Sequence, residues 1–196
     1  CQGRKVDYLI VNHMEPDHSA LIARIMDIYP DIQIVASAKA VPMIAGYHGI
    51  GADRVKVVKE GETLCLGSCT LSFHMVPMVH WPEVMVCYES SEKILFAADA
   101  FGKFGALDTE EDWACEARRY YFNNVGKYGG PVQTLLKKAS ALDIQTICPL
   151  HGPILKENLD YYFNLYNIWS SYGVEAEGVF IAYASMHGNT RDAALK

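Results

Sequence analysis

The segment from His13 to His18 carries the densest group of metal-binding side chain types in this 196-residue chain. Two imidazoles and two carboxylates fall within six positions, in the order His-Met-Glu-Pro-Asp-His. Residues two apart in an extended loop face the same way, so we expect His13 and Glu15 to reach one metal ion. Asp17 and His18 then face a second ion. The plainer alternative is a helix start with Asp17 or Ser19 as N-cap and an exposed His13, but the density of ligands favours a metal site.

The local pattern places this segment between a strand and a helix. The apolar run over residues 6–11 predicts a buried strand, and apolar residues at helical spacing over 19–29 predict an amphipathic helix. Loops that follow strands often carry functional groups. We therefore expect the polar segment to form a strand-to-helix loop.

Three further candidate ligands stand in the same kind of position, just beyond a predicted strand. They are His80 after strand 70–76, Asp99 after strand 93–98 and His151 after strand 144–148. In a layered α/β fold such strand ends gather along one edge, where sites are built. One histidine after a strand is more often structural, and it is the recurrence that indicates a shared site. His48 and His74 have no such position, and we expect them to be structural.

The remaining pattern predicts a mixed α/β fold. The other expected strands are 31–37, 55–59, 63–66 and 83–89, and the other expected helices are 38–47, 109–125, 131–141 and 158–172. At the helix ends we expect Gly49 as a C-terminal glycine, Thr109 as an N-cap with Asp112 closing a capping box, Pro131 at the first helical position and Gly173 after the last helix.

A change in composition predicts a domain boundary near Glu175, between domain 1–174 and the start of another at 175–196. A strand is expected over 179–184, followed by the turn 185–190, Ser-Met-His-Gly-Asn-Thr, and a helix. Hydroxyls and backbone amides at a helix N-terminus form an anion site, although Ser, Asn and Thr also make ordinary caps. Because the chain begins at Cys1 without Met and stops inside a helical pattern, we expect an internal fragment of a longer protein.

Composition excludes several classes of protein. Hydrophobic residues make up 51% and charged residues 20% of the chain, which is typical of a globular protein. The net charge of −6, without a basic patch, gives no support to nucleic-acid binding. No apolar run approaches the roughly 20 residues that span a bilayer. The six cysteines lack CxxC spacing, which predicts reduced thiols in a cytoplasmic protein.

The order His13-x-Glu15-x-Asp17-His18, then His80, Asp99 and His151, resembles the metallo-β-lactamase superfamily. More narrowly it resembles the flavodiiron proteins, or A-type flavoproteins, which include the rubredoxin:oxygen oxidoreductases. The zinc hydrolases of the superfamily usually carry His where this chain has Glu15, and mixed His/carboxylate ligation suits iron better than zinc. The resemblance implies an αββα sandwich without its opening strands, followed by the first strand, loop and helix of a flavodoxin-like domain.

The resemblance also implies roles for individual residues. One iron takes His13, Glu15 and His80, the other takes Asp17 and His151, and Asp99 bridges the pair. His18 is a ligand in some members of the family and is displaced by water in others. The resemblance continues through Trp81-Pro82-Glu83 and the pair Tyr120-Tyr121, which places a phenol near the metals without selecting one of the two. Core packing is the simpler explanation for that pair.

The turn 185–190 resembles the phosphate-binding loop of flavodoxins, which holds the FMN phosphate. In that match Ser185, Asn189 and Thr190 supply side chains, whereas Met186, His187 and Gly188 supply backbone. The resemblance implies a cytoplasmic oxidoreductase that passes electrons from FMN to a di-iron centre and reduces O2 to water, NO to N2O, or both. It implies a head-to-tail homodimer and an electron donor such as rubredoxin or a flavoprotein reductase.

Two other functions are compatible with these residues. A dizinc hydrolase would activate a bridging water against a thioester, lactone or phosphodiester. A binding or electron-transfer module would carry an idle metal site. Glu15 and the flavodoxin-like segment favour the oxidoreductase over both. We expect residues 1–196 to bind metal but not to retain FMN.

Overall fold

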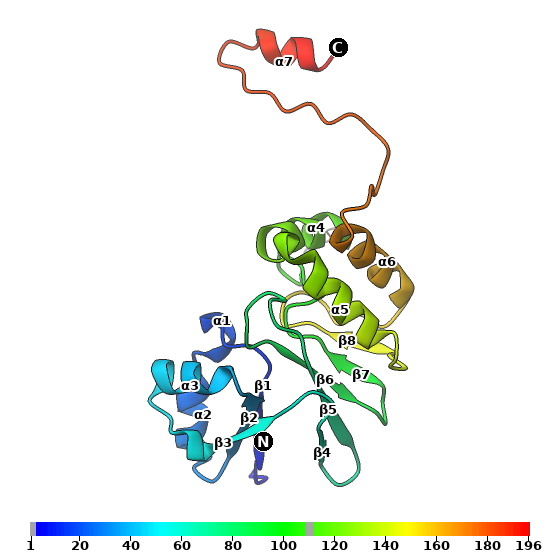
Figure 1. Cartoon of the computed structure of the whole chain (residues 1–196). Coiled ribbons are helices and arrows are strands. Elements are labelled where there is room, and N and C mark those ends of the chain that lie inside the picture. Colours follow the sequence, from blue (N-terminus) through cyan, green and yellow to red (C-terminus); the bar gives the residue numbers. More distant parts are fainter. Residues whose placement is uncertain (1–2, 109–111) are drawn as a thin grey trace.

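The computed structural model describes residues 3–108 and 112–196, and its strands form two sheets (Figure 1). The first sheet is parallel, in the order β1 (Tyr8–Val11), β2 (Gln33–Ser37) and β3 (Val55–Val58). The second is in chain order: β4 (Thr63–Cys65), β5 (Thr70–Met75), β6 (Met85–Glu89), β7 (Ile94–Phe96) and β8 (Thr146–Cys148). Its neighbours are antiparallel except for β7 and β8, which are parallel.

The helices fall into two groups and a separate terminal helix (Figure 1). The first group is α1 (Pro16–Ser19), α2 (Ile22–Ile28) and α3 (Ala40–His48). The second group is α4 (Trp113–Asn124), α5 (Gly129–Ala139) and α6 (Leu159–Ser170), and α7 (Asn189–Ala194) lies apart. Short 3₁₀ turns cover Ala52–Arg54 and Gly126–Tyr128. Within the described part of the chain, no helix has both the length and the apolar character needed to cross a membrane.

Three buried clusters hold these layers together. On β2, Ile34 and Ala36 pack with α2 and α3, whereas Val35 lies on the opposite face, in a cluster that contains Phe73 and Met85 of the second sheet. This alternation is the period of two that a strand requires, and both of its faces are buried. A third, larger cluster joins the second sheet to α4, α5 and α6. The order is therefore helix, sheet, sheet, helix, and the αββα expectation is confirmed.

The first helical region differs from the expectation of one helix over 19–29. α1 begins at Pro16, and a break at Ala20 and Leu21 separates it from α2. Proline favours this first position because it has no N–H to leave unpaired and its φ is already helical. Glu15 occupies the N-cap, and Ser19 Oγ donates to the Met14 carbonyl at 2.9 Å. The plainer alternative, in which Asp17 or Ser19 is the N-cap, is therefore wrong.

Other helix ends shift by a few residues. α4 begins at Trp113, with the Asp112 carboxylate accepting from the Cys115 amide at 3.1 Å. The expected cap Thr109 lies outside the described residues. α5 begins two residues before Pro131, so the proline stands within the first turn and not at its first position. Gly49 has φ 68° and ends α3 as expected.

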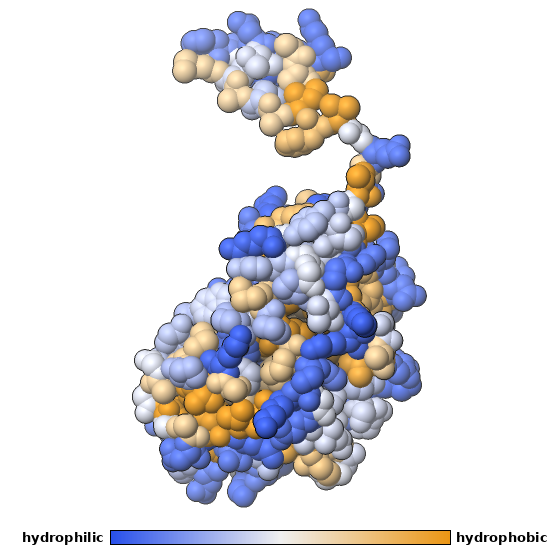
Figure 2. Space-filling view, in the orientation of Figure 1, coloured by the Kyte–Doolittle hydropathy of each residue, from blue (hydrophilic) through white to orange (hydrophobic). Residues whose placement is uncertain are grey.

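The expected strand over 179–184 is wrong. Those residues have no regular secondary structure, and all residues from 171 to 187 are exposed. Val179 and Phe180 expose 89% and 91% of their surface, and Figure 2 shows hydrophobic residues along this segment. A strand requires a neighbour to pair its backbone, and within the described residues none lies beside this run.

Candidate metal centre

The candidate ligands come together at one edge of the second sheet. Because β5 and β7 both run antiparallel to β6, and β8 runs parallel to β7, the carboxyl ends of these three strands lie at the same edge. His80, Asp99 and His151 follow those ends. The segment after β1 is fixed there too, because Met85 N–H donates to the Asn12 carbonyl at 3.1 Å.

One group of donors comprises His13, Glu15, His80 and Asp99, whose ligand atoms all lie within 4.8 Å of one another. His80 Nε2 is 3.0 Å from both Glu15 Oε2 and Asp99 Oδ2. His13 Nε2 is 3.3 Å from Glu15 Oε2 and 3.5 Å from Asp99 Oδ2. His13 is only 2% exposed, so the alternative in which it is simply solvent-facing was wrong.

The second group comprises Asp17, His18 and His151, also with ligand atoms within 4.8 Å of one another. Asp17 and His18 both lie on α1. His151 Nε2 lies 3.2 Å from Asp17 Oδ2, and His18 Nε2 lies 3.5 Å from the same oxygen. The other oxygen of Asp99, Oδ1, lies 3.1 Å from His18 Nε2. Asp99 thus presents one carboxylate oxygen to each group.

Two buried atoms between the groups fit a cation. His18 Nε2 and Asp99 Oδ1 are close, yet neither has a hydrogen-bond partner of acceptable geometry within the described residues. Buried polar atoms are normally satisfied, and an ion-binding role is one explanation for an exception. The donor set, four imidazoles with three carboxylates, suits a transition metal such as iron.

Charge interactions couple the Asp99 carboxylate to the neighbouring histidines. Burial lowers the pKa of His18 and of His80, but the Asp99 carboxylate outweighs burial, and both pKa values are raised. Burial raises the pKa of Asp99, but the neighbouring His18 and His80 outweigh burial and hold that pKa far below its usual range. These contacts therefore favour the protonated forms of His18 and His80 and the ionised form of Asp99.

The loop that carries Asp99 is fixed by contacts of Phe101 with Tyr166 on α6. Phe101 N–H donates to the buried Tyr166 hydroxyl at 2.6 Å, and the two rings stack at 4.3 Å. Gly102 passes so close that a Cβ atom there would lie 2.9 Å from the Asp99 carbonyl oxygen and 3.3 Å from His151 Cβ. Glycine therefore allows the Asp99 loop and the His151 loop to touch.

The structure separates the two tyrosines that the sequence left undecided. Tyr120 is buried with its ring 5.5 Å from that of His151, and burial together with Asp99 raises the pKa of its hydroxyl. Tyr121 packs against Tyr166 and Trp169 in the core. The sequence could not distinguish Tyr120 from Tyr121. Adjacent helical residues point in different directions, and only the fold determines which of them faces the candidate ligands.

Glu83 was not among the expected site residues. It is 2% exposed, and its Oε1 accepts from His13 Nδ1 at 2.7 Å and from the Met14 amide at 2.9 Å. Burial raises its pKa, but these hydrogen bonds outweigh burial and lower it. The available signal was a glutamate three residues after His80, directly before the apolar run of residues 84–88.

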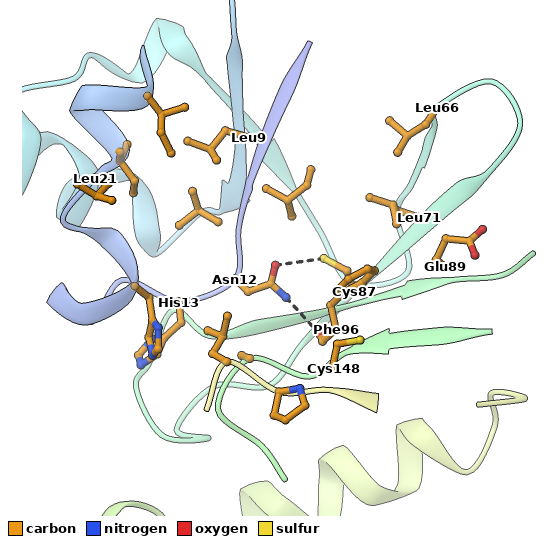
Figure 3. A pocket seen from close by; sticks show the side chains of 18 of the residues that line it. Leu9, Asn12, His13, Leu21, Leu66, Leu71, Cys87, Glu89, Phe96 and Cys148 are labelled. Carbon is orange, nitrogen blue, oxygen red and sulfur yellow. Dashed lines mark hydrogen bonds between the residues drawn. The ribbon is translucent and has the colours of Figure 1, made fainter. Parts of the chain in front are cut away.

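An apolar groove of about 540 Å³ lies beside the centre, between β1 and the second sheet (Figure 3). Leu9, Leu66 and Leu71 line it, and it meets the candidate ligands at His13 and His18. Asn12 stands at its base, where Nδ2 donates to the Phe96 carbonyl at 3.3 Å and Oδ1 accepts from Cys87 Sγ at 3.4 Å.

The remaining sequence candidates lie elsewhere. His48 is on α3, and His74 on β5 contacts Ser72 and Glu60, so both are outside the two groups. The turn 185–190 leads into α7, with Gly188 at φ 88° as its N-cap. Figure 1 shows α7 well apart from α1 and from both sheets.

Comparison with known proteins places this geometry in a family. The model of the family described as ODP family beta lactamase matches residues 1–152. The chain belongs to this ODP family. The anaerobic nitric oxide reductase flavorubredoxin of Salmonella arizonae is 31% identical to it over 196 residues, which covers 95% of this chain and 41% of that protein.

Solved structures agree with the family. A variant of the flavo di-iron protein from Thermotoga maritima has a TM-score of 0.75 and 32% identity, covering 82% of this chain and 42% of that one. The rubredoxin oxygen:oxidoreductase of Desulfovibrio gigas has a TM-score of 0.80 and 27% identity, covering 85% and 44%. The resemblance to flavodiiron proteins is confirmed. This ODP family chain spans 49% and 33% of the first two curated relatives it matches.

Proposed function

We propose that this chain carries the di-iron centre of a flavodiiron oxidoreductase that reduces O2 to water, NO to N2O, or both. The observation that carries the proposal is Asp99, whose two oxygens face two separate donor groups, one of which contains Glu15. In this assignment His13, Glu15 and His80 would hold one iron, Asp17, His18 and His151 would hold the other, and Asp99 would be shared by both. The nitric oxide reductase and oxygen oxidoreductase named among the similar proteins support this reaction class.

The residues of the chain prepare the site for that reaction. Iron, when bound, supplies the one-electron chemistry that the reduction of O2 or NO requires. In the first group Asp99 and His13 are buried, at 1% and 2% exposure, whereas the Glu15 side chain is 33% exposed and forms the solvent-facing side. A tyrosine hydroxyl is protonated at neutral pH, and burial together with Asp99 raises the pKa of Tyr120 further, so this hydroxyl has a proton to donate at the edge of the centre.

The flavin belongs to the same proposal. We assign residues 1–174 to the metal domain and 175–196 to the start of an FMN-binding domain, with residues 185–190 at the FMN phosphate. The resemblance to flavodiiron proteins also supports a head-to-tail homodimer, in which the FMN of one copy would serve the irons of the other. We further propose a cytoplasmic protein that receives electrons from rubredoxin or a flavoprotein reductase.

Elemental analysis tests this function. The intact protein is purified without oxygen, its iron and zinc are measured, and its flavin absorbance is recorded on the same sample. We expect two irons and one FMN per chain, with consumption of O2 or NO when the flavin is reduced. Two zincs without flavin, together with hydrolysis of a thioester or lactone, would instead establish the hydrolase.

A further inference from the structure

The Glu83 carboxylate connects the two sheets directly behind one candidate ligand, His13. Its Oε1 accepts from His13 Nδ1 and from the Met14 amide, and its backbone carbonyl accepts from Ser37 Oγ at 2.6 Å. The side chains of Glu83 and His13 both have 0% exposure. The other oxygen, Oε2, is buried without a hydrogen-bond partner in the described residues. A buried carboxylate is costly, so its position calls for a role.

The hydrogen bond determines which nitrogen of His13 is free. A carboxylate accepts and never donates when ionised, so His13 must carry its proton on Nδ1. Nε2 then presents its lone pair to the point where Glu15 and His80 also converge. Within the described chain, the other three candidate histidines have no such partner on Nδ1.

Charge points the same way. The two donor groups contain three carboxylates, Glu15, Asp17 and Asp99. Glu83 supplies a fourth negative charge. The four carboxylates together therefore balance the charge of two divalent ions. A carboxylate behind a ligating imidazole also increases its basicity and strengthens the metal bond.

We propose that Glu83 is the positioning residue of the first metal position: it fixes the Nδ1–H form of His13 and makes that position bind metal more tightly than the second. The inference rests on the proposed metal centre. The second position has no equivalent carboxylate among the described residues, and its Asp17 and His151 side chains are 50% and 33% exposed. Metal therefore fills the His13 position first.

Cobalt titration of the intact, metal-free protein tests the proposal, because Co²⁺ absorption reports its ligands. We expect two Co²⁺ sites of unequal affinity in the wild type. Glu83→Gln keeps an acceptor for His13 and Met14 but removes the charge, and Glu83→Ala removes both. We expect each to weaken the tight site by about 10–100-fold and to leave the weak site within about twofold, with the alanine variant weaker than the glutamine variant.

Glu89→Gln is the matched control. Glu89 is also a buried carboxylate on β6 that accepts from backbone amides, at 2.9 Å from Ser91 and 2.7 Å from Glu92, but it is outside both donor groups. It should leave both affinities unchanged. Equal weakening of both sites by Glu83→Gln, or the same effect from Glu89→Gln, would reduce Glu83 to a structural residue.

Nitrogen-15 NMR of histidine-labelled, metal-free protein gives a readout that does not depend on metal. We expect His13 in the Nδ1–H form in the wild type, with its Nδ1 proton shifted upfield in Glu83→Gln. An Nε2–H form in the wild type would overturn the proposal by itself. A wild type with the Nδ1–H form that binds no Co²⁺ would refute the metal centre, and with it the positioning role, by a distinguishable route.

Discussion

At the scale of single residues, the centre is a set of donors that repel one another unless a cation or protons lie between them. Three carboxylates and four imidazoles meet at one sheet edge, and Asp99 faces both groups. When no cation is bound, the raised pKa values of His18 and His80 favour protons on these two histidines. Metal and protons therefore compete for the same nitrogens.

This competition predicts how stability depends on pH. The raised pKa values of His18 and His80 give stability that is present below their ordinary value of 6.5 and is lost as pH rises through the raised values. The lowered pKa of Asp99 gives stability present above its ordinary 3.8 and lost in more acid solution. Urea unfolding in the presence of a chelator should therefore show the free energy of unfolding falling from pH 6 to 8.

Metal should reverse the trend, because binding releases those protons and so strengthens with pH. The gap in unfolding free energy between metal-loaded and metal-free protein should widen from pH 6 to 8. His80→Gln should flatten the metal-free profile, whereas His74→Gln, outside both groups, should leave it unchanged. A metal-free protein that gains stability over this range would contradict the prediction.

The candidate ligands could be predicted from the sequence because each follows a strand, and strand ends share an edge. Glu83 and the choice of Tyr120 over Tyr121 could not. Their roles depend on which side chain meets which across the fold, and Glu83 contacts His13 from 70 positions away. No local pattern records such a pairing.

At the scale of elements, β7, β8 and the loops after them determine how closely the two donor groups approach. Leu150 N–H donates to the Ala98 carbonyl at 2.8 Å, so the His151 loop is bonded to the residue before Asp99. Gly102 lies at the same crossing. The shared carboxylate is therefore positioned by backbone contacts as well as by its own neighbours.

Gly102→Ala should separate these loops. The new Cβ would lie 2.9 Å from the Asp99 carbonyl oxygen. Because this oxygen belongs to the backbone, relieving the clash requires the loop itself to move. We expect a loss of about 1–3 kcal/mol in unfolding free energy and weaker metal binding at both positions. Gly46→Ala is the control, because a Cβ there has nothing within 4 Å and the site is helical. It should stabilise the protein by up to about 1 kcal/mol. Unchanged metal binding in Gly102→Ala would show that the loops tolerate separation.

Element types were mostly predictable because hydrophobic period decides them, and the errors have physical causes. The first helix starts early because Pro16 suits the first position of a helix. The run over 179–184 has strand composition, but a strand also needs a neighbour, which the described residues do not provide. Composition predicts a preference, and pairing decides the outcome.

At the scale of the whole molecule, the folded part of the chain, which we call the body, ends at Glu175. We call the contacts of Glu175 with Arg118 and Trp169 the clamp. Arg118 binds the Glu175 carboxylate, with Nε 2.8 Å from Oε2, and Trp169 Nε1 donates to the same oxygen at 2.6 Å. Trp169 is itself 2% exposed and belongs to the largest core cluster. Glu175 therefore joins the exposed C-terminal segment to the core, and this position is close to the domain boundary expected from composition.

Truncation tests where the body ends. A chain that stops after Glu177 keeps the clamp and removes only exposed residues, so its unfolding free energy should stay within about 0.5 kcal/mol of that of the full chain. A chain that stops after Val174 loses Glu175 and leaves the Trp169 indole N–H and Arg118 without their partner, which should cost about 1 kcal/mol. Glu175→Gln within the longer truncation separates loss of charge from loss of chain, and we expect an intermediate value by urea unfolding. A loss of more than about 1 kcal/mol in unfolding free energy on stopping after Glu177 would be twice the usual effect of a surface change. That result would show that residues 178–196 pack on the body and are attached by more than the clamp.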